Sequence, residues 1–338
     1  MRFGFGGSNA CNCCASAWGL KAGFVCLHVI LVGGVFVVSE GLIVETRLHP
    51  WYTALYLLLV VFTISQYFYT IASSPGYVLD AMKDKFVAEA HATHASDMIS
   101  RLAMNGGSLS RIVPASIVNI NDESYGPPTF DGDAKFKGLA NMPETIQSTG
   151  SPSRDGMCSY CNIWKPPRSK HCHDCGKCVL EFDHHCLWLG TCIGERNHCK
   201  FWWYLFEETI LGMWTAVMYI QSFIEHGSGR WWHIGLATLL LIILIICLIF
   251  STGLLIFHSY LAITNQTTYE VSRRRRISYL RNLPETVHPF SKGLVRNVYS
   301  FCCSRNDFYA IHSLPPIEEL EAKARPYTCW DVLSCRGC

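Results

Sequence analysis

The sequence predicts an all-α integral membrane protein, with four transmembrane helices and a small cytosolic cysteine-rich domain between the second and third helices. Half of the 338 residues are hydrophobic, and they gather in four blocks, with most of the charge between or after these blocks. Eight of the 18 cysteines fall within residues 158–200, together with five histidines. The net charge of +2 indicates neither a nucleic-acid-binding protein nor a disordered chain, so we expect no nucleic-acid partner.

The N-terminal part contains the first two predicted transmembrane helices. Residues 22–44 form an apolar block whose only charge is Glu40, and residues 51–72 carry no charge. Each block has the roughly 20 apolar residues that cross a bilayer as a helix. The first block is longer than the apolar part of a signal peptide, and no small-residue cleavage site follows it, so we expect it to remain in the protein.

Cysteines also occur in the terminal segments. Residues 1–21 are expected to form a cytosolic N-terminus. Three cysteines there and two near the other end of the chain are either acylated or unmodified thiols. These are Cys11, Cys13, Cys14, Cys302 and Cys303.

A turn and a long polar segment follow the second predicted helix. Pro75 and Gly76 predict the turn, because proline ends a helix and glycine tolerates the backbone reversal. Residues 77–157 then mix charges with many small and polar residues and lack sustained periodicity. This composition predicts a flexible cytosolic linker that contains at most one short helix.

The cysteine-rich stretch over residues 158–200 has the spacing of metal ligands. Dense cysteine also suits disulfides in a secreted domain, but two C-x-x-C pairs with nearby histidines favour zinc in a reducing compartment. Structural zinc takes four thiolate or imidazole ligands and leaves no position open. Six cysteines and two histidines would therefore complete two closed sites. The six are Cys158, Cys161, Cys172, Cys175, Cys178 and Cys192.

Two cysteines of this stretch remain after that assignment, Cys186 and Cys199. Cys186 directly follows Asp183, His184 and His185. A cysteine nucleophile needs an imidazole that takes the thiol proton and a carboxylate that orients the imidazole. Cys186 is therefore the candidate nucleophile. Cys199 has no nearby carboxylate, and we interpret it as an interfacial thiol.

Two further apolar blocks predict the third and fourth transmembrane helices, over residues 201–223 and 234–263. The third begins with Phe-Trp-Trp-Tyr, an aromatic cluster suited to the membrane interface, and contains Glu207 and Glu208. These carboxylates either have a function inside the helix bundle or reach cytosolic water, and the sequence leaves both open. The fourth block has 30 residues and would be about 45 Å long as a helix, so its C-terminal part should extend into the cytosol.

Basic residues predict the orientation. The loops between the first and second helices and between the third and fourth carry one arginine each, Arg47 and Arg230. The other segments hold the remaining basic residues, including four consecutive arginines at 273–276. The positive-inside rule therefore places both termini and the cysteine-rich stretch in the cytosol. The arginine run is either solvated membrane-flanking charge or a contact for anionic headgroups.

Several short motifs lie within the cysteine-rich stretch. They are Pro166-Pro167-Arg168, His171-Cys172, Asp183-His184-His185-Cys186, Cys192 and Asn197. With them, residues 158–200 resemble the cysteine-rich domain of the DHHC family of integral-membrane protein S-acyltransferases. The resemblance implies that His184 and Asp183 serve Cys186, and that the domain binds two zinc ions. The implied ligands are Cys158, Cys161, His171 and Cys178 for one ion, and Cys172, Cys175, His185 and Cys192 for the other.

The resemblance extends beyond this domain. The family usually has Asp-Pro-Gly after the second helix, where this chain has Ser74-Pro75-Gly76, and we expect the Pro-Gly pair to preserve the turn. Residues 264–338 form a cytosolic C-terminal region that contains the family's Thr-Thr-x-Glu motif and a match to its C-terminal motif, an asparagine near an aromatic residue. The implied supporting residues are Thr267, Thr268, Glu270 and Asn297, with Tyr299 as the aromatic residue.

The resemblance also implies an activity. Palmitate or a similar long acyl chain would pass from acyl-CoA to Cys186 and then to cysteines of membrane-associated proteins. Expected partners are the lipid bilayer, long-chain acyl-CoA and proteins with membrane-proximal cytosolic cysteines. The chain looks like plant members of the family, which suggests an endomembrane location, with the Golgi or vacuolar membrane favoured over the plasma membrane.

Three other classes of protein are open to the sequence. A zinc-bearing membrane adaptor would not need the surplus Cys186 beside a histidine and an aspartate. A metal transporter would need polar ligands within the spans, where only Glu207 and Glu208 qualify. An acyl-CoA thioesterase would use the same nucleophile but pass the acyl group to water.

Overall fold

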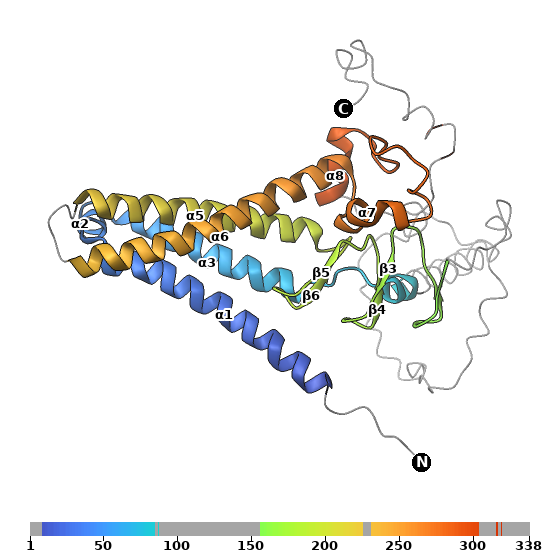
Figure 1. Cartoon of the computed structure of the whole chain (residues 1–338), viewed down its shortest axis with the longest axis horizontal. Helices are drawn as coiled ribbons and strands as arrows, with labels where there is room; N and C mark the ends of the chain where they lie inside the picture. Colours follow the sequence, from blue (N-terminus) through green and yellow to red (C-terminus); the bar gives the residue numbers. More distant parts are fainter. Residues whose placement is uncertain are drawn as a thin grey trace, which may run out of the picture. The chain divides into compact units, whose positions relative to one another are not determined.

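The computed structural model describes residues 9–84, 87, 156–225, 231–303, 316 and 319. The chain divides into two units, one of Met1–Met82 with Cys158–Cys338 and one of Lys83–Met157. Almost all described residues belong to the first unit, in which long helices lead at one end into the cysteine-rich domain (Figure 1). Most of the predicted linker, 77–157, lies outside the described residues.

Four long helices lie side by side in the first unit: α1 (Asn9–Val38), α3 (Pro50–Ala72), α5 (His198–Glu225) and α6 (Trp231–Thr264) (Figure 1). α5 packs against α3 and α6, and α1 packs against α5 and α6. The core between them is apolar and includes the buried Val35, Tyr56 and Leu240. Tyr219 crosses this core and donates a hydrogen bond from its hydroxyl to the Leu31 carbonyl at 2.7 Å.

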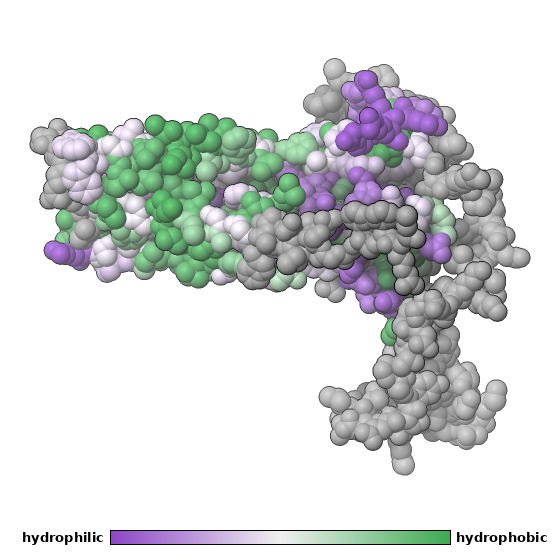
Figure 2. All heavy atoms as spheres, turned by 60° about the horizontal axis from the view of Figure 1, so that its bottom comes forward, coloured by the Kyte–Doolittle hydropathy of each residue, from purple (hydrophilic) through white to green (hydrophobic). Residues whose placement is uncertain are grey.

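Three of the described helices are long and apolar enough to cross a membrane, over Gly19–Val38, Pro50–Ala72 and Trp231–Thr264. α5 has the length but a lower hydropathy, because Glu207, Glu208 and other polar residues interrupt its sequence. Hydrophobic side chains cover much of the outer surface of the helices (Figure 2). A broad exposed apolar surface is unusual for a soluble protein and is compatible with helices that face lipid.

The first predicted transmembrane helix, 22–44, is not continuous. α1 ends at Val38, and a short helix, α2 (Glu40–Leu48), follows. The Ser39 hydroxyl accepts a hydrogen bond from the Leu42 amide at 3.1 Å, as an N-cap residue does. The Ser39 amide donates to the Val35 carbonyl at 2.9 Å and closes α1. One serine thus ends one helix and begins the next, which corrects the expectation of a single helix over this block.

The end of α6 carries the C-terminal elements. Its 34 residues correspond to about 51 Å, which exceeds the roughly 30 Å of a hydrocarbon core. After it come α7 (Thr268–Arg273), the 3-10 helix η5 (Arg274–Arg276) and α8 (Leu294–Cys302). α8 packs against α6. The side-chain amide of Asn297 donates to the Ile263 carbonyl at 2.6 Å and satisfies one of the last carbonyls of α6.

The cysteine-rich domain is built from hairpins, so the expectation of an all-α chain is wrong for this part. Three pairs of short strands occur among the described residues, and the second and third pairs are antiparallel. Their tight turns include Gly176 and Gly190, whose φ angles of 64° and 65° suit glycine. The pairs are β1 (Met157–Cys158) with β2 (Ile163–Trp164), β3 (Lys170–Cys172) with β4 (Lys177–Val179), and β5 (His184–Cys186) with β6 (Thr191–Ile193).

The turn after α3 joins the helices to this domain. The Ser74 hydroxyl accepts a hydrogen bond from the Gly76 amide at 3.2 Å, so the serine supports the turn that we expected the Pro-Gly pair to preserve. The Gly76 carbonyl accepts from the Leu180 amide at 2.8 Å, and the Pro75 carbonyl accepts from the Arg196 amide at 3.3 Å. The backbone of the turn is therefore bonded directly to the domain.

The first residues of the predicted linker are ordered in a helix. Residues 78–84 are helical, and Val78 and Ala81 are buried. They belong to an apolar cluster with Cys158, Cys178 and Leu180. The sequence allowed one short helix in the linker, and this helix is ordered because its apolar side chains pack against the cysteine-rich domain.

Candidate active site and metal clusters

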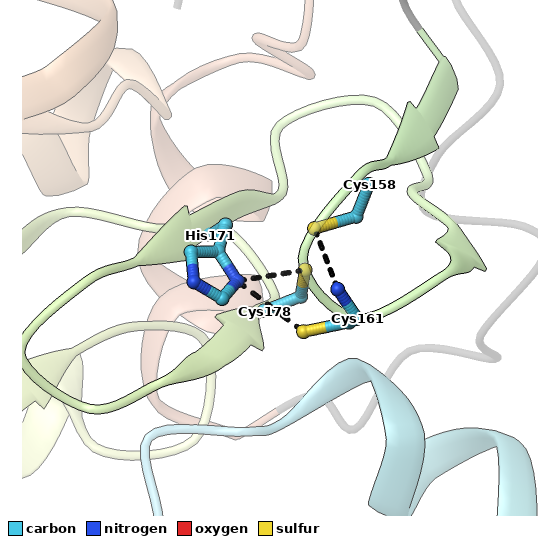
Figure 3. Close-up of side chains that lie close together, drawn as sticks. All are labelled: Cys158, Cys161, His171 and Cys178. Atoms are coloured by element: carbon cyan, nitrogen blue, oxygen red, sulfur yellow. Dashed lines mark hydrogen bonds between the residues drawn. The ribbon is translucent and has the colours of Figure 1, made fainter. Parts of the chain in front are cut away.

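The first metal cluster gathers Cys158, Cys161, His171 and Cys178 (Figure 3). The His171 Nδ1 atom lies 3.2 Å from the Cys161 sulfur and 3.8 Å from the Cys178 sulfur. Ligand atoms around a tetrahedral zinc ion, with bonds of about 2.0–2.3 Å, are about 3.5–3.8 Å apart. Three thiolates and one imidazole at these separations suit a structural zinc ion.

The second cluster has the same donor set, formed by Cys172, Cys175, His185 and Cys192. The His185 Nδ1 atom lies 3.5 Å from the Cys172 sulfur, 3.4 Å from the Cys175 sulfur and 3.6 Å from the Cys192 sulfur. The Cys175 and Cys192 sulfurs are 3.4 Å apart. The structure thus brings together both ligand sets that the family resemblance implied, and both are suited to zinc.

Strand register separates the two clusters from each other and from the candidate nucleophile. His171 pairs with Cys178 across β3 and β4, and His185 pairs with Cys192 across β5 and β6, so each hairpin brings one histidine to one cysteine of the same cluster. Successive side chains of a strand point to opposite faces. In β5, His185 therefore faces the second cluster, while His184 and Cys186 face away from it.

Asp183 lies fully buried immediately before β5 and accepts hydrogen bonds from two elements. His184 Nδ1 is 2.7 Å from Asp183 Oδ2. In α7, the Thr268 amide donates to Oδ1 at 2.6 Å and the Thr268 hydroxyl donates to Oδ2 at 2.8 Å. Burial would raise the pKa of the Asp183 carboxyl, but the imidazoles of His198 and His184 hold it well below its usual range. Asp183 is therefore a fixed negative charge.

His184 connects this charge to the thiol. Burial lowers its pKa, but the hydrogen bond to Asp183 and the interaction with the Cys186 side chain raise it to about 9. Cys186 is partly exposed and packs against an apolar cluster from the helices. This cluster includes Phe24 of α1 and Tyr67 of α3. The arrangement combines a thiol, an imidazole that can accept its proton and an apolar surface beside them.

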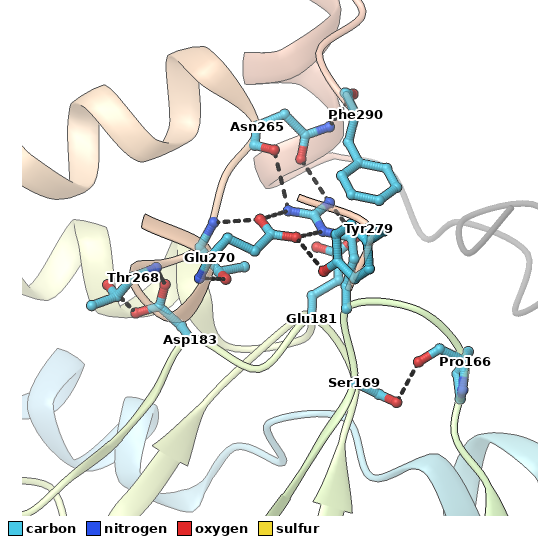
Figure 4. A network of polar contacts seen from close by, with 11 residues as sticks. Pro166, Ser169, Glu181, Asp183, Asn265, Thr268, Glu270, Tyr279 and Phe290 are labelled. Carbon is cyan, nitrogen blue, oxygen red and sulfur yellow. Dashed lines mark hydrogen bonds and ion pairs between the residues drawn. The ribbon is translucent and has the colours of Figure 1, made fainter. Parts of the chain in front are cut away.

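A buried ion pair fixes α7 against the cysteine-rich domain (Figure 4). Arg168 donates from Nε and Nη2 to the two carboxylate oxygens of Glu270 at 2.8 and 3.0 Å. Glu270 also accepts from the Thr267 amide at 2.9 Å, and the Thr267 hydroxyl accepts from the Glu270 amide at 3.2 Å. This reciprocal capping box starts α7. The sequence placed Arg168 only within a motif, and its position explains how Thr268 reaches Asp183.

The two residues of the C-terminal motif differ in their surroundings. Asn297 is buried and connects α8 to α6, and its side-chain oxygen also accepts from the Lys292 amide at 2.8 Å. Tyr299 is 63% exposed, on the opposite side of α8. The structure therefore brings Asn297, but not Tyr299, into the supporting network.

Two buried histidines that the sequence analysis did not assign lie behind Asp183. His198, the first residue of α5, is 7% exposed, and His258 of α6 is 2% exposed. His198 Nε2 is 2.9 Å from His258 Nδ1 and 3.9 Å from Asp183 Oδ1. Burial lowers the pKa of His198 despite the nearby Asp183. A signal for His258 existed, because it lies in the part of the fourth block that was predicted to extend beyond the bilayer.

Cys199 is not a plain interfacial thiol. Its sulfur is bonded to that of Cys302, so the start of α5 is linked covalently to the end of α8. The two residues are 103 positions apart, and no local pattern around either cysteine indicates the pairing. Cys303, the neighbour of Cys302, has a free exposed thiol.

One of the two carboxylates of α5 points into the helix bundle. Glu208 accepts a hydrogen bond from His28 Nε2 of α1, with 3.0 and 3.1 Å to its two oxygens. Glu208 thus has a partner inside the bundle, while 22% of its side chain remains exposed. One oxygen of Glu207 is buried without a hydrogen-bond partner among the described residues.

Comparison with known proteins adds independent information. The family model of DHHC palmitoyltransferases matches residues 151–275. The chain is 46% identical over 323 residues to "Protein S-acyltransferase 10" of Arabidopsis thaliana, which covers 94% of this chain and 90% of that protein. It is 35% identical to "Probable protein S-acyltransferase 7" of the same plant, over 60% of this chain and 48% of the relative. It is also 34% identical to "Putative ZDHHC-type palmitoyltransferase 7" of Dictyostelium discoideum, over 43% and 34%.

Proposed function

The chain belongs to the DHHC palmitoyltransferase family and transfers palmitoyl groups to protein cysteines, and from this premise we propose that Cys186 carries the acyl group as a covalent thioester. His184 is its base, and Asp183 orients His184. One observation carries the proposal: Cys186 and His184 lie on the face of β5 away from the metal cluster, with His184 bonded to the buried Asp183. A ligand would point into a cluster, as His185 between them does.

The first step transfers the acyl group from acyl-CoA to Cys186. His184 takes the proton of the Cys186 thiol, and the thiolate attacks the thioester carbonyl of a long-chain acyl-CoA. The carbon–sulfur bond to coenzyme A breaks, and the departing thiolate takes the proton from His184. The products are S-acyl Cys186 and free coenzyme A. Asp183 remains ionised throughout and stabilises the imidazolium.

The second step transfers the acyl group from Cys186 to the substrate protein. A cysteine thiol of the substrate protein gives its proton to His184 and attacks the S-acyl carbonyl. The bond to Cys186 breaks, and its thiolate recovers the proton. One thioester replaces another in each step, so the reaction needs no further energy source. An adaptor without chemistry would not need this array.

We assign two structural zinc ions to the domain, one in each four-residue cluster. Three thiolates and an imidazole close a tetrahedral site, so zinc supplies folding energy and leaves no position for a substrate. The ligands are Cys158, Cys161, His171 and Cys178 for the first, and Cys172, Cys175, His185 and Cys192 for the second. The residues that serve Cys186 are separate from both sets.

We further assign four spans, with α5 as the third. α5 is less apolar than the other three long helices, but it packs between α3 and α6 and pairs Glu208 with His28, so its polar side chains find partners inside the bundle. With two helices on each side of the domain, the positive-inside rule places the domain and both termini in the cytosol. The acyl chain then lies among the helices, next to the apolar cluster that contacts Cys186.

This placement also defines the substrates. Burial of an acyl chain in hydrocarbon contributes about 0.8 kcal/mol per CH₂, so the chain stays in the membrane while its carbonyl meets the interface. Only cytosolic cysteines close to a membrane can reach it. We propose an endomembrane location, with the Golgi or vacuolar membrane favoured over the plasma membrane, as the resemblance to plant members of the family suggests.

A test must separate transfer from hydrolysis. The purified full chain is mixed with palmitoyl-CoA and lipid vesicles that carry a membrane-anchored peptide with one cysteine. We expect hydroxylamine-sensitive palmitate on the peptide, at a rate that matches coenzyme A release. A matched peptide with serine in place of the cysteine should stay unmodified. Rapid coenzyme A release with no acylated peptide would identify a thioesterase and refute the proposal.

A further inference from the structure

We propose that His198 and His258 are positioning residues of the transfer reaction: this buried imidazole pair fixes the Asp183 carboxylate and, through it, His184. Neither residue contacts Cys186 in the described interactions. The inference rests on the proposed roles of Asp183 and His184. It adds a connection from Asp183 and His184 to the ends of two long helices, α5 and α6.

The geometry of the pair supports this role. His198 Nε2 and His258 Nδ1 are 2.9 Å apart, so one of the nitrogens donates to the other and each fixes the orientation of its partner. His198 Nε2 then lies 3.9 Å from Asp183 Oδ1. The backbone of His198 is itself held, because its amide donates to the Gly194 carbonyl at 3.0 Å. The imidazole is thus presented to the carboxylate from a fixed position.

The pair also supports the ring of His184. The His258 ring centroid is 5.9 Å from that of His184, and Phe201 of α5 lies against both, at 5.7 Å from His184 and 5.0 Å from His258. On the far side, Phe301 of α8 packs edge-on against His198 at 4.9 Å. The His184 ring therefore packs against two rings, Phe201 of α5 and His258 of α6.

The buried charge of Asp183 explains why the imidazoles of His198 and His258 lie behind it. Asp183 is a fully buried carboxylate, and a buried charge is stable only among polar groups. His184 and the Thr268 hydroxyl bond to Oδ2, and the Thr268 amide donates to Oδ1. The His198 imidazole is a second polar neighbour of Oδ1, and His258 fixes its orientation. An apolar residue at position 198 would leave Oδ1 with the Thr268 amide alone, and one at position 258 would free the His198 ring to turn. In either case the carboxylate, and with it His184, would be held less firmly.

A metal ion is the alternative explanation of the same residues. Donor atoms of Asp183, His198 and His258 lie within 4.8 Å of one another. Both oxygens of Asp183 already accept hydrogen bonds, however, and the two nitrogens are at hydrogen-bond distance. The hydrogen-bonded pair therefore accounts for the geometry, and the metal content of the protein distinguishes the two.

The test compares substitutions at His258 in the full chain in detergent. His258→Leu removes the polar contact, whereas His258→Asn places an amide near the position of Nδ1 and keeps it. His233→Leu makes the same change to a buried histidine at the other end of α6 and is the matched control. The measurements are zinc per chain and the single-turnover rate of self-acylation over a range of palmitoyl-CoA concentrations.

We expect His258→Leu to lower the rate at saturating palmitoyl-CoA about tenfold, with half-saturation within about twofold of the native value and zinc content unchanged. His258→Asn should recover most of the rate. A second pair, His198→Leu against His198→Gln, tests the partner residue and keeps the comparison valid if one leucine variant fails to fold. The proposal is overturned if the leucine variants react at the native rate, if the amide variants are as slow as the leucine variants, or if His258→Leu releases a third metal ion.

Discussion

Removal of one hydroxyl tests how α7 supports the active site. Thr268→Val replaces the hydroxyl with a methyl group of similar size and deletes the 2.8 Å hydrogen bond to Asp183 Oδ2. The Thr268 amide still donates to Oδ1, and His184 still pairs with Oδ2. The change therefore weakens the hold on Asp183 without removing it.

The expected size follows from the type of bond. A hydrogen bond to a charged group contributes about 1.5–3 kcal/mol. Because two other bonds to Asp183 remain, we take the lower end, and about 1.4 kcal/mol in the barrier is a factor of ten in rate. Thr268→Val should thus lower the rate of self-acylation about tenfold, while Thr268→Ser, which keeps the hydroxyl, should stay within about threefold of the native rate.

The assay is single-turnover formation of hydroxylamine-sensitive S-acyl enzyme from palmitoyl-CoA, measured on the full chain in detergent at matched zinc content. Thr63→Val is the control, since the buried Thr63 hydroxyl donates, among the described residues, only within its own helix, to the Leu59 carbonyl at 2.9 Å. Equal rates for Thr268→Val and Thr268→Ser would refute the support that we assign to this hydroxyl.

Three further predictions concern the metal sites, the ion pair and the disulfide. Cys172→Ser and His185→Ala should each lower zinc to about one per chain and reduce thermal stability, because ligand binding supplies folding energy; native zinc content with native melting would contradict the ligand assignment. Arg168→Lys should destabilise the chain by about 2 kcal/mol in thermal unfolding, because lysine cannot pair with both oxygens of Glu270, whereas the exposed Arg281→Lys should have little effect. Alkylation without reductant should leave Cys199 unlabelled in the native chain and label it in Cys302→Ser; labelling of Cys199 in both would exclude the bond.

The number and type of zinc ligands were predictable from the sequence, because two closed sites need eight thiolate or imidazole donors and six cysteines with nearby histidines can supply them. The choice of His171 and His185, and the division into two sets, came from the family resemblance and not from spacing. What the sequence did not indicate is the hairpin structure that carries them. Strands of two or three residues have no measurable periodicity, so the alternation that turns His185 toward the metal and Cys186 away from it is visible only in the fold.

The long apolar helices were predictable from length and composition, and three of the described helices are long and apolar enough to cross a membrane. Their details, however, depend on tertiary contacts. Ser39 breaks the first block because its hydroxyl caps the next helix, and a serine in an apolar run does not by itself indicate such a break. His258 faces His198 only because of the way α6 rotates against α5. The Cys199–Cys302 bond likewise depends on the approach of two helix ends that are far apart in sequence.

The central claim is that Cys186 carries the acyl group and binds no metal, and substitution of this one sulfur tests it most directly. Intact-protein mass and zinc content are measured on native, Cys186→Ser and Cys247→Ser chains after exposure to palmitoyl-CoA; Cys247 is a free thiol in α6 that serves as the matched control. We predict one hydroxylamine-sensitive palmitoyl group on the native and Cys247→Ser chains, none at this position in Cys186→Ser, and about two zinc ions in all three. Loss of a zinc ion from Cys186→Ser, or undiminished acylation without the Cys186 sulfur, would contradict the account.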